Sequence, residues 1–209
     1  MTSGLRERRK QETRQAISDI ATEMFATRGF DAVTISQVAE AAGVAKMTVT
    51  NYFPRKEDLV FDRAETIVRS LADVIAGRAP GESMLAAIRR DYAERIARAD
   101  VTLGLSNPAF ARMIEDSPVL TGRGREIADQ RERALGDVIA AEMGADDVHQ
   151  RIVAAQLAAV HRVLYAEASR RSLAGKRRGD ICTVLAAAAS RAFDLLEPSL
   201  GDYGIRPGP

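Results

Sequence analysis

The stretch that decides the fold is residues 25–59, FATRGFDAVTISQVAEAAGVAKMTVTNYFPRKEDL. Gly29 follows the last residue of an apolar helical stripe, where a left-handed C-cap favours glycine. Gly43 then separates two further short helices, predicted over 35–42 and 44–53. Two short helices joined by a glycine turn, behind a longer helix, form a helix-turn-helix pattern.

The same periodicity extends outward on both sides of this stretch. Apolar residues at helical spacing predict a first helix over 9–28 and a fourth, after Pro54, over 55–76. Residues 77–81, GRAPG, are the clearest linker, and no segment predicts a strand. The sequence therefore predicts an all-α fold. Further helices are expected at about 84–96, 108–115, 118–143, 147–172 and 180–196.

The composition is that of a globular protein. The 209 residues include 30 Lys and Arg against 29 Asp and Glu, a net charge of +1, with 46% hydrophobic residues. That balance excludes a uniformly basic nucleic-acid coat and a disordered chain. One cysteine, Cys182, excludes an intramolecular disulfide framework. No run of about 18 apolar residues occurs, so we expect a soluble, cytoplasmic protein without a membrane partner.

The second short helix divides into two faces. Four residues are expected to point inward: Val44, Val49, Tyr52 and Phe53. A small polar and cationic set is left outside, of the kind that reaches base edges and phosphates in a major groove. Its members are Lys46, Met47, Thr48, Thr50 and Asn51. This pattern predicts double-stranded DNA as a partner.

The residue types and spacings also resemble a known family. The residues that match the family's pattern, in order, are Phe25, Gly29, Phe30, Thr34, Val38, Ala39, Ala42, Gly43 and Val44, followed by Thr48, Tyr52, Phe53, Lys56, Glu57, Asp58 and Leu59. Over roughly residues 13–60 the chain resembles the DNA-binding domain of the tetracycline-repressor (TetR) family. The resemblance implies a three-helix DNA-binding head over 1–54, a helical ligand-binding and dimerisation bundle over 55–198, and a flexible tail over 199–209.

The resemblance also implies positions for DNA contacts. It places a phosphate contact at Thr34, the first residue of the second helix, and another at Lys56. On the recognition helix it implies contacts from Lys46, Met47, Thr48, Asn51 and Tyr52. The chain departs from the family pattern at Met47, Thr50 and Asn51. Asn51 could instead bond an adenine in bidentate fashion, and Met47 could touch a thymine methyl.

The first fifteen residues form a basic arm. Five cations (Arg6, Arg8, Arg9, Lys10, Arg14) against two acids (Glu7, Glu12) leave a charge of +3. A flexible arm that meets phosphates or the minor groove is one interpretation. A solvated terminus is the other, and the sequence alone supports both equally.

The resemblance implies a small-molecule pocket between about residues 82 and 196, with a largely apolar ligand. Candidate lining residues are Tyr92, Ile96, Phe110, Met113, Leu157, His161, Leu164 and Tyr165. His161 and Tyr165 stand out, because they lie four residues apart on an apolar helix and each carries a polar tip. Ordinary core packing remains the alternative for every member of this set.

Small residues on the last two long helices predict a homodimer. They are Ala154, Ala155, Ala158, Ala159 and Ala186 to Ala189. In the TetR family the corresponding helices usually pair with their copies. The alternative is a monomer in which alanine merely fills helix interiors.

Chemistry of other kinds is poorly supported. The two histidines, His149 and His161, lack a helically spaced partner ligand, so no metal site and no cofactor is expected. Nucleophile signatures are absent, which argues against an enzyme. The sequence therefore predicts a ligand-responsive transcriptional regulator, a repressor released from a palindromic operator by a small molecule. A helical enzyme or carrier, and a helix-turn-helix protein acting through protein partners, are the rival classes.

Overall fold

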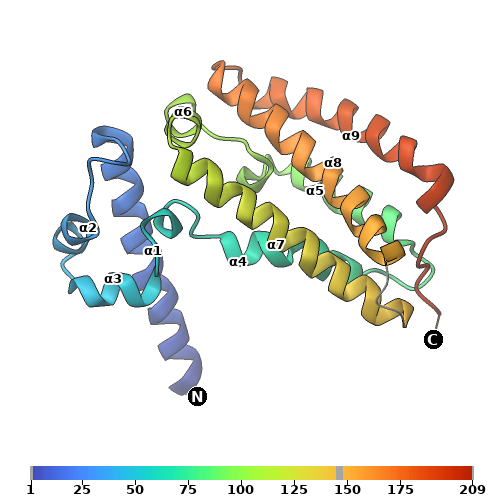
Figure 1. Cartoon of the computed structure of the whole chain (residues 1–209), viewed down its shortest axis with the longest axis horizontal. Helices are drawn as coiled ribbons and strands as arrows, with labels where there is room; N and C mark the ends of the chain where they lie inside the picture. The colour runs from blue at the N-terminus through green and yellow to red at the C-terminus, as the bar shows by residue number, and fades with distance from the viewer. Residues whose placement is uncertain (1, 145–147, 209) are drawn as a thin grey trace. The chain divides into compact units, whose positions relative to one another are not determined.

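The computed structural model describes residues 2–144 and 148–208, and every regular element in those ranges is a helix, as expected (Figure 1). The α-helices and two 3₁₀ helices are, in order, α1 (Thr2–Arg28), α2 (Ile35–Ala41), α3 (Lys46–Tyr52), η1 (Lys56–Leu59), α4 (Ala64–Ala76), α5 (Met84–Ala97), η2 (Val101–Leu103), α6 (Pro108–Asp116), α7 (Pro118–Met143), α8 (Val148–Leu173) and α9 (Arg178–Leu200). The proposed caps Asp146 and Asp147 of α8 lie outside the described residues.

The chain forms two compact units. The first comprises Met1–Ala64 and Arg112–Gly124, and the second comprises Glu65–Ala111 and Arg125–Pro209. The division expected after residue 54 therefore differs from the observed one. An ion pair of 2.9 Å between Arg123 and Asp58, both largely buried, is one contact that holds the α7 segment to the first unit.

The first unit is a head built around α1. Its core includes five side chains that are only 0–1% exposed: Ile17, Phe25, Val38, Val49 and Phe53. This arrangement fits the predicted faces of the three helices, because each contributes apolar residues at helical spacing to one core. The helix-turn-helix segment and the longer helix before it therefore share a single core.

The predicted fourth helix is interrupted. Instead of one helix over 55–76, the chain forms the short η1 and resumes a helix at Ala64. One local and one distant hydrogen bond accompany the break. The Arg55 N–H donates to the Asp58 carboxylate at 3.1 Å, and the Ser18 hydroxyl, on α1, donates to the Leu59 carbonyl at 3.0 Å. These bonds satisfy polar groups in a turn, so a continuous helix is not needed there.

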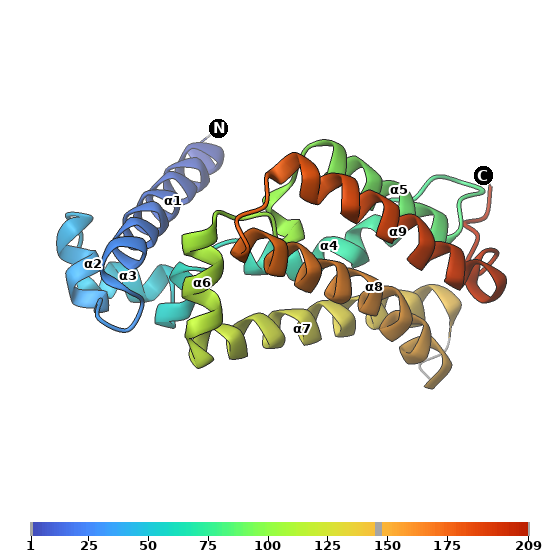
Figure 2. The ribbon, with the colours of Figure 1, turned by 90° about the horizontal axis from the view of Figure 1, so that it is seen from above.

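The second unit has its core among α4, α5, α7, α8 and α9, and α8 and α9 lie side by side (Figure 2). Its largest fully buried side chains include Tyr92, Phe193 and Leu85. None of the helices described in the chain is long and apolar enough to cross a membrane.

The tail differs from the flexible segment expected over 199–209. Helix α9 continues past Pro198 to Leu200, and Arg206 then exchanges backbone hydrogen bonds with Gly81 and Glu82 at 2.9 and 3.1 Å. The buried Arg78 donates to the Gly204 carbonyl at 2.8 Å and pairs with Glu142 at 2.6 Å. These partners hold residues up to Arg206 against the second unit.

Candidate nucleic-acid interface and sensing core

Helix α3 presents one face to solvent and anchors the other. Val49 and the following Phe53 are fully buried at 0% exposure, whereas Met47 is 69% exposed. Lys46 and Asn51 are also exposed, and Thr48 and Tyr52 are half-buried. The structure therefore brings the predicted contact residues of this helix onto one short element, whose buried face fixes its position in the head.

Thr50 is placed differently from its neighbours. Its side chain is half-buried, and its hydroxyl donates to the Met47 carbonyl at 3.1 Å. A hydroxyl that is already bonded to its own helix must break that bond before it can donate elsewhere. Among the predicted residues of α3, Thr50 is thus the least available for a new contact.

Thr34 caps α2. Its hydroxyl oxygen accepts from the Gln37 N–H at 3.3 Å, and its own N–H donates to the Gln37 side chain at 2.9 Å. This reciprocal capping box satisfies donors that the helix start would otherwise leave free. Thr34 is exposed, so the box holds it at the surface of the head.

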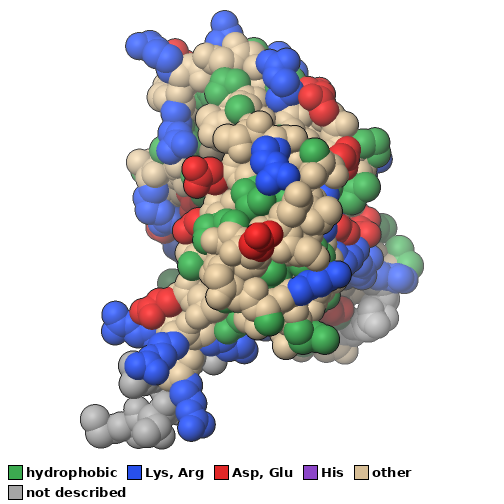
Figure 3. All heavy atoms as spheres, turned by 90° about the vertical axis from the view of Figure 1, so that its left-hand side faces the viewer, with side chains coloured by type: hydrophobic (Ala, Val, Ile, Leu, Met, Phe, Trp, Pro, Cys, Tyr) green, Lys and Arg blue, Asp and Glu red, His purple; other side chains and the backbone are tan. Residues whose placement is uncertain are grey.

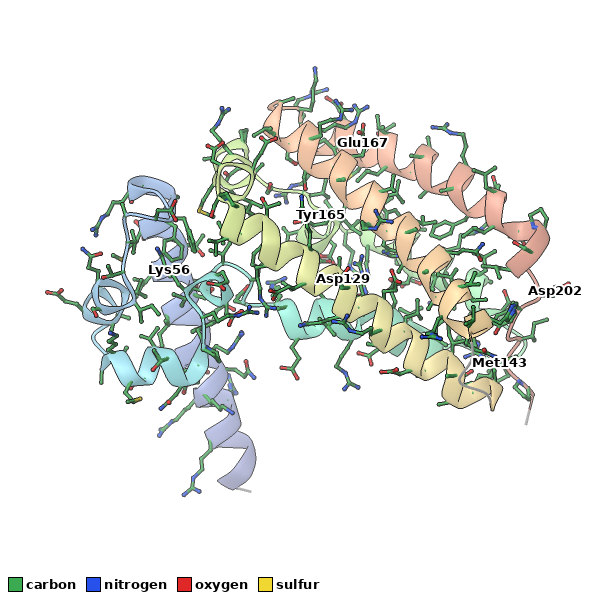
Figure 4. The ribbon with its side chains drawn as sticks, in the orientation of Figure 1. Lys56, Asp129, Met143, Tyr165, Glu167 and Asp202 are labelled. Carbon is green, nitrogen blue, oxygen red and sulfur yellow. The ribbon has the colours of Figure 1, made fainter. Side chains whose placement is uncertain are left out.

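Lys56 lies on the aromatic pair Phe25 and Phe30 (Figure 4). Its ammonium nitrogen is 4.2 Å from the Phe30 ring centroid and donates to the Asp31 carbonyl at 3.5 Å. Burial lowers the pKa of Lys56, and the nearby carboxylates of Asp31 and Glu57 partly oppose that effect. The cation–π contact thus holds the lysine head against the ring, instead of leaving it to sample solvent.

The basic N-terminal segment belongs to α1 in the structure and does not form a separate flexible arm. Arg9 and Lys10 are exposed, while Arg14 stacks on Phe53 with its guanidinium carbon 4.7 Å from the ring centroid. Figure 3 shows Lys and Arg side chains gathered at the lower end of the first unit. Most of the charge of this segment therefore stays at the surface of the head.

The predicted ligand-binding residues divide between core and surface. Tyr92, Leu157 and Leu164 belong to the core of the second unit, and Ile96 packs against it. Other members lie elsewhere: Phe110 is half-buried on α6, Tyr165 is 38% exposed, and Met113 falls in the first unit. The structure therefore brings together only part of the predicted set.

Two polar members of that set meet in the core. The rings of Tyr92 and His161 lie edge to face, with centroids 5.1 Å apart. Both side chains are buried, and within the described part of the chain neither the Tyr92 hydroxyl nor His161 Nε2 has a hydrogen-bond partner. Burial, together with the charges of Arg131 and Arg95, holds the pKa of His161 well below its ordinary value, so the ring is neutral at pH 7.

Sequence reasoning missed two arginines beside this pair. Arg95 forms an ion pair with Asp91 at 2.7 Å, and Arg131 on α7 is 91% buried. Burial lowers the pKa of Arg131 to about 10. The signal was available: Arg131 occupies the same helical face as the buried Ile127 and Leu135, a position where an apolar residue is normal.

Within residues 2–144 and 148–208, no group of three or more His, Cys, Asp or Glu side chains is placed to hold a metal ion. Cys182 is partly buried beside the core of the second unit.

A buried anchor with one exposed polar helix face defines the head as a helix-turn-helix DNA-binding domain. Residues 17–62 match the family model described as bacterial regulatory proteins, tetR family. The chain is 29% identical to the HTH-type transcriptional regulator TcmR of Streptomyces glaucescens, over 98% of this chain and 92% of that protein. The head therefore matches the DNA-binding domain of the tetR family of regulators, and the chain is similar over nearly its whole length to one transcriptional regulator.

Two further matches concern the head and the fold. The HTH-type transcriptional regulator LuxR of Vibrio harveyi is 38% identical over 30% of this chain and 31% of its own. The fold is similar to that of the crystal structure of NalD from Pseudomonas aeruginosa, with a TM-score of 0.52 and 16% identity over 88% of this chain and 97% of that one.

Proposed function

We propose that the protein is a cytoplasmic, homodimeric repressor that leaves a palindromic DNA operator when the second unit binds a small molecule. The observation that carries the proposal is the exposed face of α3, with Lys46, Met47 and Asn51 outside and Val49 and Phe53 fixed in the core. That arrangement suits insertion of α3 into a major groove. A dimer would present two such helices to the two half-sites.

Release by a ligand requires a difference in affinity. The small molecule must bind the operator-free conformation better than the operator-bound one, because a ligand with equal affinity for both shifts nothing. By linkage, the operator must weaken ligand binding by the same factor.

Selection from random double-stranded DNA by the purified protein tests the proposal. Enrichment of a sequence with twofold symmetry supports it. If no sequence is enriched even at low salt, the protein acts as an enzyme, a carrier or a binder of proteins, and the DNA-binding proposal is wrong.

Base reading by Asn51 gives a specific prediction. Its side chain is exposed on α3 and its amide matches the acceptor and donor of adenine. Asn51→Ala is expected to lower preference for one adenine in each half-site by about 1–3 kcal/mol and to leave other positions unchanged. Repeating the selection with the variant checks this, and an unaltered preference at every base pair would refute the role of Asn51.

The basic segment of α1 is expected to contribute to the salt dependence of operator binding. Arg9→Gln combined with Lys10→Gln is expected to weaken operator binding and to flatten its salt dependence, by roughly 0.9 in the log–log slope for each phosphate that the variant no longer neutralises. Both side chains are exposed near the start of α1. Fluorescence anisotropy over a salt series measures the slope.

A matched control for this experiment lies between α8 and α9. Lys176→Gln combined with Arg178→Gln removes two exposed cations of the second unit. The control should leave the slope unchanged. An unaltered slope in the Arg9 and Lys10 variant would assign the basic segment to solvent instead.

The structure narrows the surface proposed for dimerisation. Ala154 and Ala158 are buried within the chain's own core, so they are not free to meet a second copy. Large apolar residues are exposed on the same two helices instead, with Val163 59% exposed on α8 and Leu195 80% exposed on α9. Exposed apolar surface of this kind marks interaction sites.

We expect Val163→Glu combined with Leu195→Glu to convert a dimer into a monomer, because two charges would be buried without partners at the interface. Light scattering at micromolar concentration measures the mass. Val119→Glu, at a residue 51% exposed on α7, is the control and should leave the mass unchanged. A wild-type protein that is monomeric at this concentration would contradict the dimer.

A further inference from the structure

We propose that the ligand of the second unit carries an anionic oxygen group, a carboxylate or a phenolate, and that Arg131 forms an ion pair with that group beside Tyr92 and His161. This inference rests on the proposed function in one respect only, namely that the second unit binds a small molecule. It names the chemistry of the ligand, which neither the family match nor the relatives specify.

The first step is that Arg131 is largely buried and its Nε–H group has no acceptor among the described residues. Its side chain belongs to α7 and is 91% buried, and its Nε atom has no hydrogen-bond acceptor among the described residues. In the same part of the chain no carboxylate lies within ion-pair distance of the guanidinium. An N–H group that is buried without an acceptor is unfavourable, because it has lost its hydrogen bond to water and gained none in exchange.

The second step is that the neighbouring charged groups do not neutralise the positive charge of Arg131. Arg95 opposes the positive charge of Arg131 and is itself paired with Asp91 at 2.7 Å, whereas Tyr165 favours that charge to a smaller extent. His161 is buried and neutral, so it adds no charge of its own. Among the described residues, Arg131 therefore contributes a largely buried positive charge that has no carboxylate partner.

The third step is that other unpaired polar atoms lie in the same cluster. His161 Nε2 and the Tyr92 hydroxyl, on rings 5.1 Å apart, both lack partners among the described residues. Arginine matches a carboxylate with two parallel N–H donors, and a tyrosine hydroxyl donates a further bond. Tyr92 on α5 and His161 on α8 thus supply unpaired polar atoms beside each other, and Arg131 on α7 is an electrostatic neighbour of His161.

The remaining surroundings describe the rest of the ligand. Tyr92 packs edge to face on Phe193, with centroids 6.1 Å apart, and Leu157 and Leu164 are buried in the same core. Such walls favour an apolar body. The expectation of a largely apolar ligand is thereby refined to an apolar body with one acidic group.

Paired probes test the inference on the full-length protein. Calorimetric titration compares 2-naphthoate with 2-naphthamide, and decanoate with decanamide, which have similar shapes but differ in charge. At least one carboxylate is expected to bind roughly tenfold to a hundredfold more tightly than its amide. Arg131→Gln should abolish that preference, and Arg131→Lys should retain part of it because the charge remains.

Arg133→Gln, at a position two residues along α7, is the control and should leave the preference unchanged. A second measurement needs no ligand: Arg131→Met is expected to raise the melting temperature of the free protein, because it removes an unpaired buried charge. The proposal is overturned if no carboxylate binds more tightly than its amide, if the preference survives in folded Arg131→Gln, or if Arg131→Met lowers the melting temperature.

These outcomes are separable from those of the proposed function. A protein that selects a palindrome but shows no charge preference would refute the anionic ligand alone. A protein that selects no DNA but binds carboxylates through Arg131 would refute the repressor and leave the anion site standing.

Discussion

Phe53→Ala is expected to cost the head about 3–5 kcal/mol of unfolding free energy and to abolish operator binding. Phe53 follows α3, is fully buried at 0% exposure, and carries the Arg14 guanidinium on its ring at 4.7 Å. Its removal leaves a cavity beneath the helix that we propose enters the major groove. Chemical denaturation followed by circular dichroism measures the stability, and anisotropy with the selected operator measures binding.

Met47→Ala is the matched comparison for Phe53→Ala. Met47 lies on α3 itself but is 69% exposed, so its truncation should change stability by less than about 0.5 kcal/mol. A loss in Phe53→Ala of under about 1 kcal/mol with unaltered binding would show that the recognition helix is held in place by other residues.

Gly104→Ala is expected to lower the free energy of unfolding of the second unit by about 2–4 kcal/mol. Gly104 has a φ of +90°, and an added Cβ would lie 2.8 Å from the Tyr165 carbonyl oxygen and 3.2 Å from the Ala168 Cβ. Those atoms belong to the backbone and core-facing side of α8, so relief requires η2 and α8 to separate. Thermal or denaturant unfolding measures the loss.

Gly179→Ala provides the control in the same unit. It lies at the start of α9, and a Cβ there meets no heavy atom within 4 Å. Alanine should be neutral or stabilising by up to about 1 kcal/mol, because it restricts the unfolded chain. Equal stability of the two variants would show that the surroundings of Gly104 adapt at little cost.

Local signals were enough to predict the head. The glycines at 29 and 43 and the buried face of Val49 act over a few residues, so their spacing along the chain carries the information. The interruption after η1 was missed because it depends on distant partners. The Ser18 hydroxyl, on α1, reaches the Leu59 carbonyl only once the head has folded.

The polar cluster of the second unit was harder to predict for a related reason. The sequence grouped His161 with Tyr165 and gave Tyr92 only as one candidate lining residue, whereas the contact of His161 with Tyr92 depends on the packing of α5 and α8. An arginine on an apolar helix face can extend its head to water, so the position of Arg131 in sequence did not establish its burial. Only the packed helices show that most of its side chain is buried.

The hydrogen-bonded segment after α9 has a consequence for how the protein is engineered. Arg78, Gly81 and Glu82 form hydrogen bonds with backbone groups of Gly204 and Arg206. A reporter or tag fused at Leu200 would therefore remove part of the folded second unit. A fusion made beyond Arg206 leaves these groups in place. The practical end of the folded domain is therefore Arg206, and biosensor fusions should place their linkers after it.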